Sequence, residues 1–155
     1  MSKPKTNVPP TPAKPSARAS HADRLLRQGW ASIALWMSVG LLLEGLLGYK
    51  IPAYLNDPQR RELFRLGHTH GTLLGILLVV AALVLERGVE VPKAARTALR
   101  TGAVLMPAGF FIGGIWHSES DPGLAIWLVP IGALLVIYAA VAFTLAHFKK
   151  PPTED

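Results

Sequence analysis

The chain has 155 residues, half of them apolar, with a mean hydropathy of +0.33 and a formal net charge of +6. The apolar residues come in long runs, which is typical of a membrane protein and excludes an ordinary soluble domain. Cysteine is absent from the sequence, which excludes disulfides, thiolate metal sites and iron–sulfur clusters.

The N-terminal segment is rich in Pro, Ala, Ser and Lys, and it contains no acidic residue before Asp23. Such a composition cannot bury enough apolar surface to offset the entropy lost on ordering. We therefore expect a disordered basic tail over residues 1–22, a membrane domain over residues 23–150 and a short polar tail over residues 151–155.

Four apolar stretches approach the length of about 20 residues that a helix needs to cross a bilayer. They cover residues 29–49, 66–85, 97–116 and 124–148. The sequence thus predicts an all-α membrane protein, a bundle of four transmembrane helices. The third stretch is the shortest, and a start at Ala94 would lengthen it, with Arg96 and Arg100 snorkelling to the interface.

Local signals refine this prediction. Asp57 followed by Pro58 is a helix-start signal, and residues 60–66 can continue as helix into the second span. Pro107 and Pro130 lie inside the third and fourth spans. There they predict kinks, because neighbouring helices can satisfy the carbonyls that proline leaves free.

The distribution of Lys and Arg predicts the orientation. Most of them lie before the first span, between the second and third, and after the fourth, whereas the other side carries Lys50, Arg60, Arg61 and Arg65. By the positive-inside rule both termini are cytoplasmic. We expect a multi-pass protein of the bacterial inner membrane. Its basic residues form no contiguous surface for RNA or DNA, so we expect no nucleic-acid partner.

Four ionisable residues within or beside the spans are the candidate site. Glu44, His68, His70 and His117 all fall near the extracytoplasmic ends, and an ionisable group at membrane depth suggests function. At 100° per residue, Glu44 lies among the glycines of its helix and His117 continues the line of Gly109 and Gly113. Glu44, His68 and His117 are therefore expected to point into the bundle.

Details of this site stay open. The tilt of side chains places Glu44 below the histidines, as a residue that orients a ring or handles protons rather than as a direct ligand. If residues 66–70 were extended, His68 and His70 would share one side as a chelating pair. The simpler interpretations are that His117 contacts lipid headgroups and that Glu44 is a protonated carboxyl hydrogen-bonded across the bundle.

Small residues predict how the helices pack, because glycine lets backbones approach closely in lipid. The candidate packing positions are Gly40, Gly48, Gly67, Gly71, Gly75, Gly109 and Gly113.

Three histidines and a carboxylate without cysteine suit zinc or copper, or the iron of haem b. Haem would need His68 or His70 together with His117. Arg60, Arg61 and Arg65 would then neutralise the propionates, or otherwise anchor lipid headgroups.

The stretch Leu66-Gly67-His68-Thr69-His70-Gly71-Thr72-Leu73-Leu74-Gly75 resembles the histidine-bearing helices of haem-copper oxidases and nitric oxide reductases. The resemblance implies haem or metal near the outer side of the membrane. The wider pattern, with Gly109-Phe110-Phe111-Ile112-Gly113-Gly114 and Asp121-Pro122-Gly123, resembles small four-span bacterial inner-membrane proteins of unassigned function.

No nucleophile–base pair or phosphate loop occurs, which favours a binding or accessory protein over an independent enzyme. The leading hypothesis is a polar Glu/His site for a metal ion or haem b in a redox-related role. The alternatives are a metal-free proton or substrate site at Glu44, and an assembly subunit whose glycine faces pack on a membrane partner or a second copy.

Overall fold

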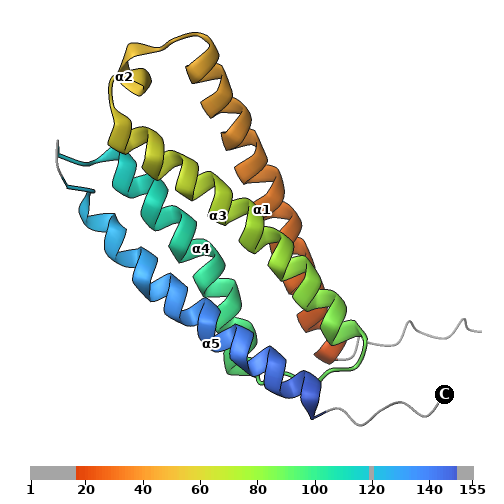
Figure 1. The fold of residues 1–155 in the computed structure, drawn as a ribbon. Helices are drawn as coiled ribbons and strands as arrows, with labels where there is room; N and C mark the ends of the chain where they lie inside the picture. Colours follow the sequence, from red (N-terminus) through yellow and green to blue (C-terminus); the bar gives the residue numbers. More distant parts are fainter. Residues whose placement is uncertain (1–16, 119–120, 150–155) are drawn as a thin grey trace, which may run out of the picture.

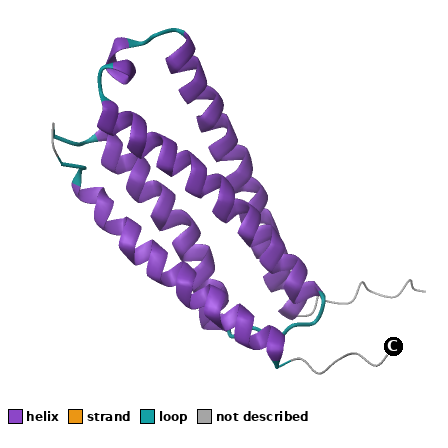
Figure 2. Cartoon of the chain, in the orientation of Figure 1, coloured by secondary structure: helices purple, strands orange, loops and turns teal. Residues whose placement is uncertain are grey.

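The computed structural model describes residues 17–118 and 121–149, and within these ranges the chain forms helices and no strand (Figure 2). The elements, in chain order, are α1 (Ala17–Gly48), α2 (Pro52–Leu55), α3 (Pro58–Glu86), α4 (Lys93–Ile115), the 3-10 helix η1 (Leu124–Trp127) and α5 (Leu128–Phe148).

Four of these segments are long and apolar enough to cross a membrane: His21–Gly48, Pro58–Glu86, Lys93–Ile115 and Leu124–Phe148. The expected four long helices are thereby confirmed. The third of these long helices, α4, begins at Lys93, and the earlier start supplies the length that residues 97–116 lacked. Pro107 lies within α4 and Pro130 within α5, and neither ends its helix.

The first helix begins earlier than expected. It starts at Ala17 rather than at residue 29, so residues 17–22 are helical and do not belong to a disordered tail. Alanine and arginine, both strong helix formers, dominate residues 17–22. Ala22 and, in the next turn, Leu25 are buried. The rest of the expected N-terminal tail, residues 1–16, and the expected C-terminal tail lie outside the described residues.

The long helices pack in series (Figure 1). α1 lies against α3, α3 against α4, and α4 against α5. α1 and α5 are therefore the outer members, and both expose large apolar side chains such as Leu41 and Leu134. Such surfaces suit lipid contact. Because four long helices alternate in direction, α1 begins and α5 ends at one end of the bundle, called here the terminal end, and α2 lies at the other, called the α2 end.

Most of the buried apolar side chains gather toward the terminal end. The cluster joins Ala22 and Leu25 of α1 to side chains of the later helices, including Leu78, Ala82, Leu85, Ala95, Leu99 and Ala139. Here α1 also reaches α4, because Gln28 Nε2 donates to the Arg100 carbonyl at 2.8 Å and Arg100 Nε donates to Gln28 Oε1 at 2.7 Å.

Glycines set the closest approaches between helices. A Cβ at Gly75 would come 3.1 Å from the Gly29 carbonyl oxygen of α1, and one at Gly102 would come 2.7 Å from the Gly132 carbonyl oxygen of α5. Gly71 faces the Trp36 ring, and Gly67 faces Pro107 and Phe111 of α4. Gly71 and Gly75 of α3 therefore allow close packing on α1, whereas Gly67 allows it on α4.

Gly109 and Gly113 face the α5 side, as expected of packing positions, and Gly40 faces α3. Gly48 departs from the expectation, because open space surrounds it. The reason is that α1 diverges from α3 toward the α2 end, so the last turn of α1 has no long helix packed against it (Figure 1). This divergence makes room for the site.

Candidate functional site

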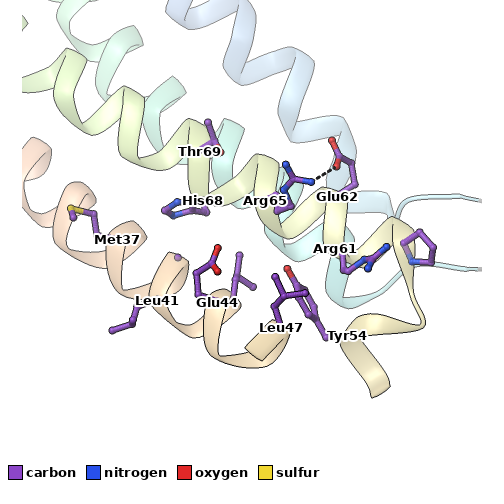
Figure 3. Close-up of a pocket in the computed structure, with 13 residues that line it drawn as sticks. Met37, Leu41, Glu44, Leu47, Tyr54, Arg61, Glu62, Arg65, His68 and Thr69 are labelled. Atoms are coloured by element: carbon purple, nitrogen blue, oxygen red, sulfur yellow. Dashed lines mark ion pairs between the residues drawn. The ribbon is translucent and has the colours of Figure 1, made fainter. Parts of the chain in front are cut away.

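A cavity of about 640 Å³ lies between α1 and α3 at the α2 end (Figure 3). Its polar lining includes Glu44, Tyr54, Arg61, Glu62, Arg65, His68 and Thr69, and its apolar lining includes Met37, Leu41, Leu43 and Leu47. This volume falls within the range of small-molecule sites. Two of the residues expected to form a site, Glu44 and His68, therefore do share one pocket.

His68 is held in one orientation by α1. Its Nδ1 lies 2.6 Å from the Trp36 carbonyl oxygen, and since a carbonyl only accepts, Nδ1 carries the proton and donates. The ring lies over Gly40, where any Cβ would overlap it. Nε2 makes no hydrogen bond to the described residues. A histidine fixed in this way offers Nε2 as an acceptor, a donor when protonated, or a ligand.

Ser32 adds a second polar link between the same helices. Its Oγ donates to the Gly71 carbonyl at 3.0 Å, one turn of α3 beyond His68. Hydrogen bonds of this kind help to fix helix pairs in lipid. The wall that carries His68 is consequently well ordered relative to α1.

Glu44 points across the cavity toward α3, where His68 and Arg65 lie (Figure 3). It is four residues from the end of α1, about 6 Å along the helix axis. Arg65 pairs loosely with Glu62 at 3.7 Å, and both side chains are exposed, so this pair contributes little to stability. Formal charge within the pocket is balanced, because its lining contains two arginines, Arg61 and Arg65, and two glutamates, Glu44 and Glu62.

Tyr54 of α2 closes the cavity and is only 5% exposed. Its ring stacks on Phe64 at a centroid distance of 6.5 Å, and Phe64 stacks on Phe111 at 4.5 Å. Burial raises the pKa of the Tyr54 phenol and Glu44 adds to the rise, while Arg61 and Arg65 act in the opposite direction. The phenol therefore remains a neutral hydroxyl, able to donate a hydrogen bond.

His70 lies on the other flank of α3. Its Nδ1 donates to the Leu66 carbonyl at 2.8 Å within the helix, and its ring lies 5.0 Å from that of Phe110 on α4. Residues 66–70 are helical. The extended arrangement that would make His68 and His70 a chelating pair is thus not formed, because helical phase turns the two rings toward different neighbours.

His117 belongs to a different site. The α4 helix ends at Ile115, and Trp116 has φ −114° and ψ 80°, so helical phase no longer determines where His117 points. Its Nε2 lies 2.9 Å from Asp57 Oδ2, and its Nδ1 donates to the Ser118 carbonyl at 2.8 Å. The contact with Asp57 lacks the alignment of a hydrogen bond, and it is an ion pair when the imidazole is protonated.

Asp57 is the centre of this second polar cluster. Its Oδ1 accepts from the Arg60 backbone N–H at 2.9 Å, which confirms the expected helix start, and its Oδ2 lies 3.4 Å from Arg60 Nη2. Burial by itself raises the pKa of Asp57. The Arg60 N–H and the charges of His117 and Arg60 outweigh it, and the net pKa is lowered. Arg60 also donates to the Gly114 and Ala53 carbonyls, so it ties α2, α3 and α4 together.

Within the described part of the chain, no three His, Cys, Asp or Glu side chains are grouped as a metal ion would require. His68, His70 and His117 each have separate surroundings, and both nitrogens of His117 are engaged. A two-histidine haem would require His117 to leave Asp57. Among the expected site residues, His68 and Glu44 contribute potential ligand atoms to the pocket, namely His68 Nε2 and the Glu44 carboxylate.

Tyr54 and Trp36 were not anticipated as site residues. Tyr54 fits the general pattern of interfacial aromatics. The role of Trp36 depends on its backbone carbonyl, which no residue pattern reveals. Asp57 was recognised as a helix cap, but its contact with His117 joins residues 60 positions apart.

Comparisons of this chain with protein-family models, with curated proteins and with solved structures found no match.

Proposed function

We propose that this chain is a multi-pass protein of the bacterial inner membrane, with both termini cytoplasmic, that binds a small lipid-soluble molecule in the pocket between α1 and α3. The observation that carries the proposal is that the fixed His68 ring and Glu44 line the same cavity of about 640 Å³. With this orientation the pocket lies at the extracytoplasmic end.

The position of the pocket supports a ligand that arrives from the lipid. Met37 and Leu41 line the cavity and are also 59% and 77% exposed on the apolar outer face of α1. The cavity is therefore open sideways, at the level of the membrane-spanning segment. A ligand can enter between α1 and α3 without passing through the polar loops.

The lining also supports a class of ligand. Two arginines balance two glutamates, so the pocket has no net formal charge if His68 is neutral. Tyr54, His68 and Glu44 offer hydrogen bonds, while Met37, Leu41 and Leu47 offer an apolar wall. These groups suit an amphipathic molecule with an apolar body and a head that is neutral or zwitterionic. Because carboxyl and imidazole groups serve as proton donors and acceptors in many sites, the head can be one that gains or loses a proton.

The alternative of a metal or haem b site has less support, because the three histidines lie in separate surroundings. The assembly-subunit alternative also has less support. The glycines that would serve a partner, such as Gly71, Gly75 and Gly109, pack against helices of the same chain.

The test is to purify the protein from membranes in a mild detergent, extract it with organic solvent and identify the bound molecules by mass spectrometry. We expect one lipid-soluble species to accompany the wild type, and to be depleted about tenfold or more in His68→Ala and Glu44→Ala, as for loss of one hydrogen bond to a charged group. His147→Ala, at the terminal end, is the matched control. Equal recovery from all four proteins would contradict the proposal.

A further inference from the structure

A third polar cluster, separate from the pocket and from the Asp57 cluster, lies at the terminal end of the bundle. It consists of five basic or titratable side chains, from α1 and from the start of α4: His21, Arg24, Lys93, Arg96 and Arg100. We name it the basic cluster. These side chains surround a cavity of about 50 Å³. A water molecule needs roughly 10–15 Å³ of such space, so the cavity has room for a group of a few heavy atoms.

The positive charge of the basic cluster is not compensated within the described part of the chain. Arg24, Lys93, Arg96 and Arg100 all act electrostatically on His21, and no carboxylate there forms an ion pair with any of them. The nearest described ion pair on α1, between Arg27 and Asp23, is exposed and separate. The first turn of α4 contains no acidic residue, so the positive end of its helix dipole adds to the field.

Arg96 shows that a partner is missing. Its Nε is buried and has no hydrogen-bond acceptor among residues 17–118 and 121–149. A buried donor of a charged group without an acceptor costs about 1–3 kcal/mol or more, so native structures rarely retain one. Arg100 is different, because Gln28 Oε1 accepts from its Nε at 2.7 Å. The Gln28 contact also holds Arg100 in place beside the cavity.

From these three observations we infer that the basic cluster binds a phosphate group, with the Arg96 guanidinium as the central donor and Arg24, Lys93 and Arg100 supplying further charge. A phosphate offers several acceptor oxygens, and guanidinium groups recognise it with short, charge-assisted hydrogen bonds. The inference is independent of the proposed pocket ligand, since the two sites share no residue. The phosphate can belong to an anionic lipid headgroup or to a soluble compound.

The experiment uses the full chain in dodecyl maltoside, a detergent without phosphate. Thermal unfolding is measured while either inorganic phosphate or phosphatidylglycerol is added, and phosphatidylcholine is the lipid control. Arg96→Gln is compared with Arg27→Gln, which removes the same charge from an exposed position nearby. We expect Arg96→Gln to weaken the stabilising response about tenfold or more, and Arg27→Gln to change it by less than about twofold.

The two ligand arms identify the source of the phosphate. A response to inorganic phosphate that depends on Arg96 supports the site and assigns it to soluble phosphate compounds. A response to phosphatidylglycerol alone, again dependent on Arg96, supports the site and assigns it to a lipid headgroup. No response in either arm, or equal losses in the two variants, would overturn the inference.

Thermal unfolding without added phosphate or lipid shows whether Arg96→Gln itself destabilises the protein. Since Arg96 Nε has no partner among the described residues, Arg96→Gln should unfold at the wild-type temperature or above when phosphate is absent. A clear loss of stability under these conditions would show that the guanidinium is satisfied inside the protein, and would also overturn the inference.

Discussion

His117 Nε2 lies 2.9 Å from Asp57 Oδ2, and this contact joins the segment after α4 to the start of α3. The His117 side chain is 6% exposed. The pair lies beside the pocket wall without forming part of it. Substitutions of Asp57 or His117 can therefore change the stability of the α2 end without changing the residues that line the pocket.

Replacing Asp57 tests its two roles. Asp57→Ala removes both the cap of α3 and the charge facing His117, and should lower the free energy of unfolding by about 1–3 kcal/mol. Asp57→Asn keeps a capping side chain and removes the charge, so its loss should be smaller. Thermal unfolding in detergent measures both. Equal losses would show that the cap contributes nothing.

The same pair predicts a dependence of stability on pH. The pKa of Asp57 is lowered in the folded protein, so its stabilising contribution is complete above the ordinary aspartate value of about 4 and is lost as the pH falls through the lower folded pKa. Wild type should lose stability in this acidic range more steeply than Asp57→Asn. Parallel acid profiles for the two proteins would exclude Asp57 as the source.

Gly40 and Gly45 form a matched pair on one helix. A methyl at Gly40 would overlap the His68 ring, whereas nothing lies within 4 Å of one at Gly45. Gly40→Ala should cost about 1–3 kcal/mol and reduce recovery of the pocket ligand, because His68 must move. Gly45→Ala should be neutral or stabilise by up to about 1 kcal/mol. Unfolding and ligand extraction on both variants provide the check.

His117→Ala distinguishes the proposed pocket from a site shared by the histidines. We expect lower thermal stability, because Asp57 loses a partner, and ligand recovery within about twofold of wild type. A metal or haem b site that used His117 would instead lose its ligand together with its absorption or metal content. Elemental analysis and an absorption spectrum of the same sample settle which occurs.

The absence of native cysteine makes the orientation directly testable. Asn56→Cys, between α2 and α3, should react with a membrane-impermeant maleimide in intact cells. Glu90→Cys, between α3 and α4, should react only after the membrane is opened, since both termini are proposed to be cytoplasmic. The reverse pattern would invert the protein and place the pocket on the cytoplasmic side.

Much of the fold follows from the sequence because apolar run length and capping are local properties. The four long helices were predicted, and Asp57 and Pro58 marked the start of α3. The convergence of Glu44 and His68 was also foreseen, from helical phase and a shared level in the membrane. Both inferences need only the geometry of one helix at a time.

What the sequence could not provide was the relation between helices. The helical phase of α1 shows on which face Gly48 lies. It does not show that α1 diverges from α3 before that residue. Extrapolating the phase of α4 to His117 failed because the helix ends two residues earlier. The bond from His68 to the Trp36 carbonyl involves a backbone atom, which no residue pattern reveals.

The uneven placement of the buried apolar cluster has a consequence for motion. Ala22 and Leu25 pack the first half of α1 into the buried apolar cluster near the terminal end. The last turns of α1 make few such contacts. Amide hydrogens in those last turns should exchange with solvent deuterium sooner than those near Leu25. The last turns of α1 can then move while its buried first half stays packed. Such a motion would let the proposed ligand enter and leave the pocket without unfolding of the chain.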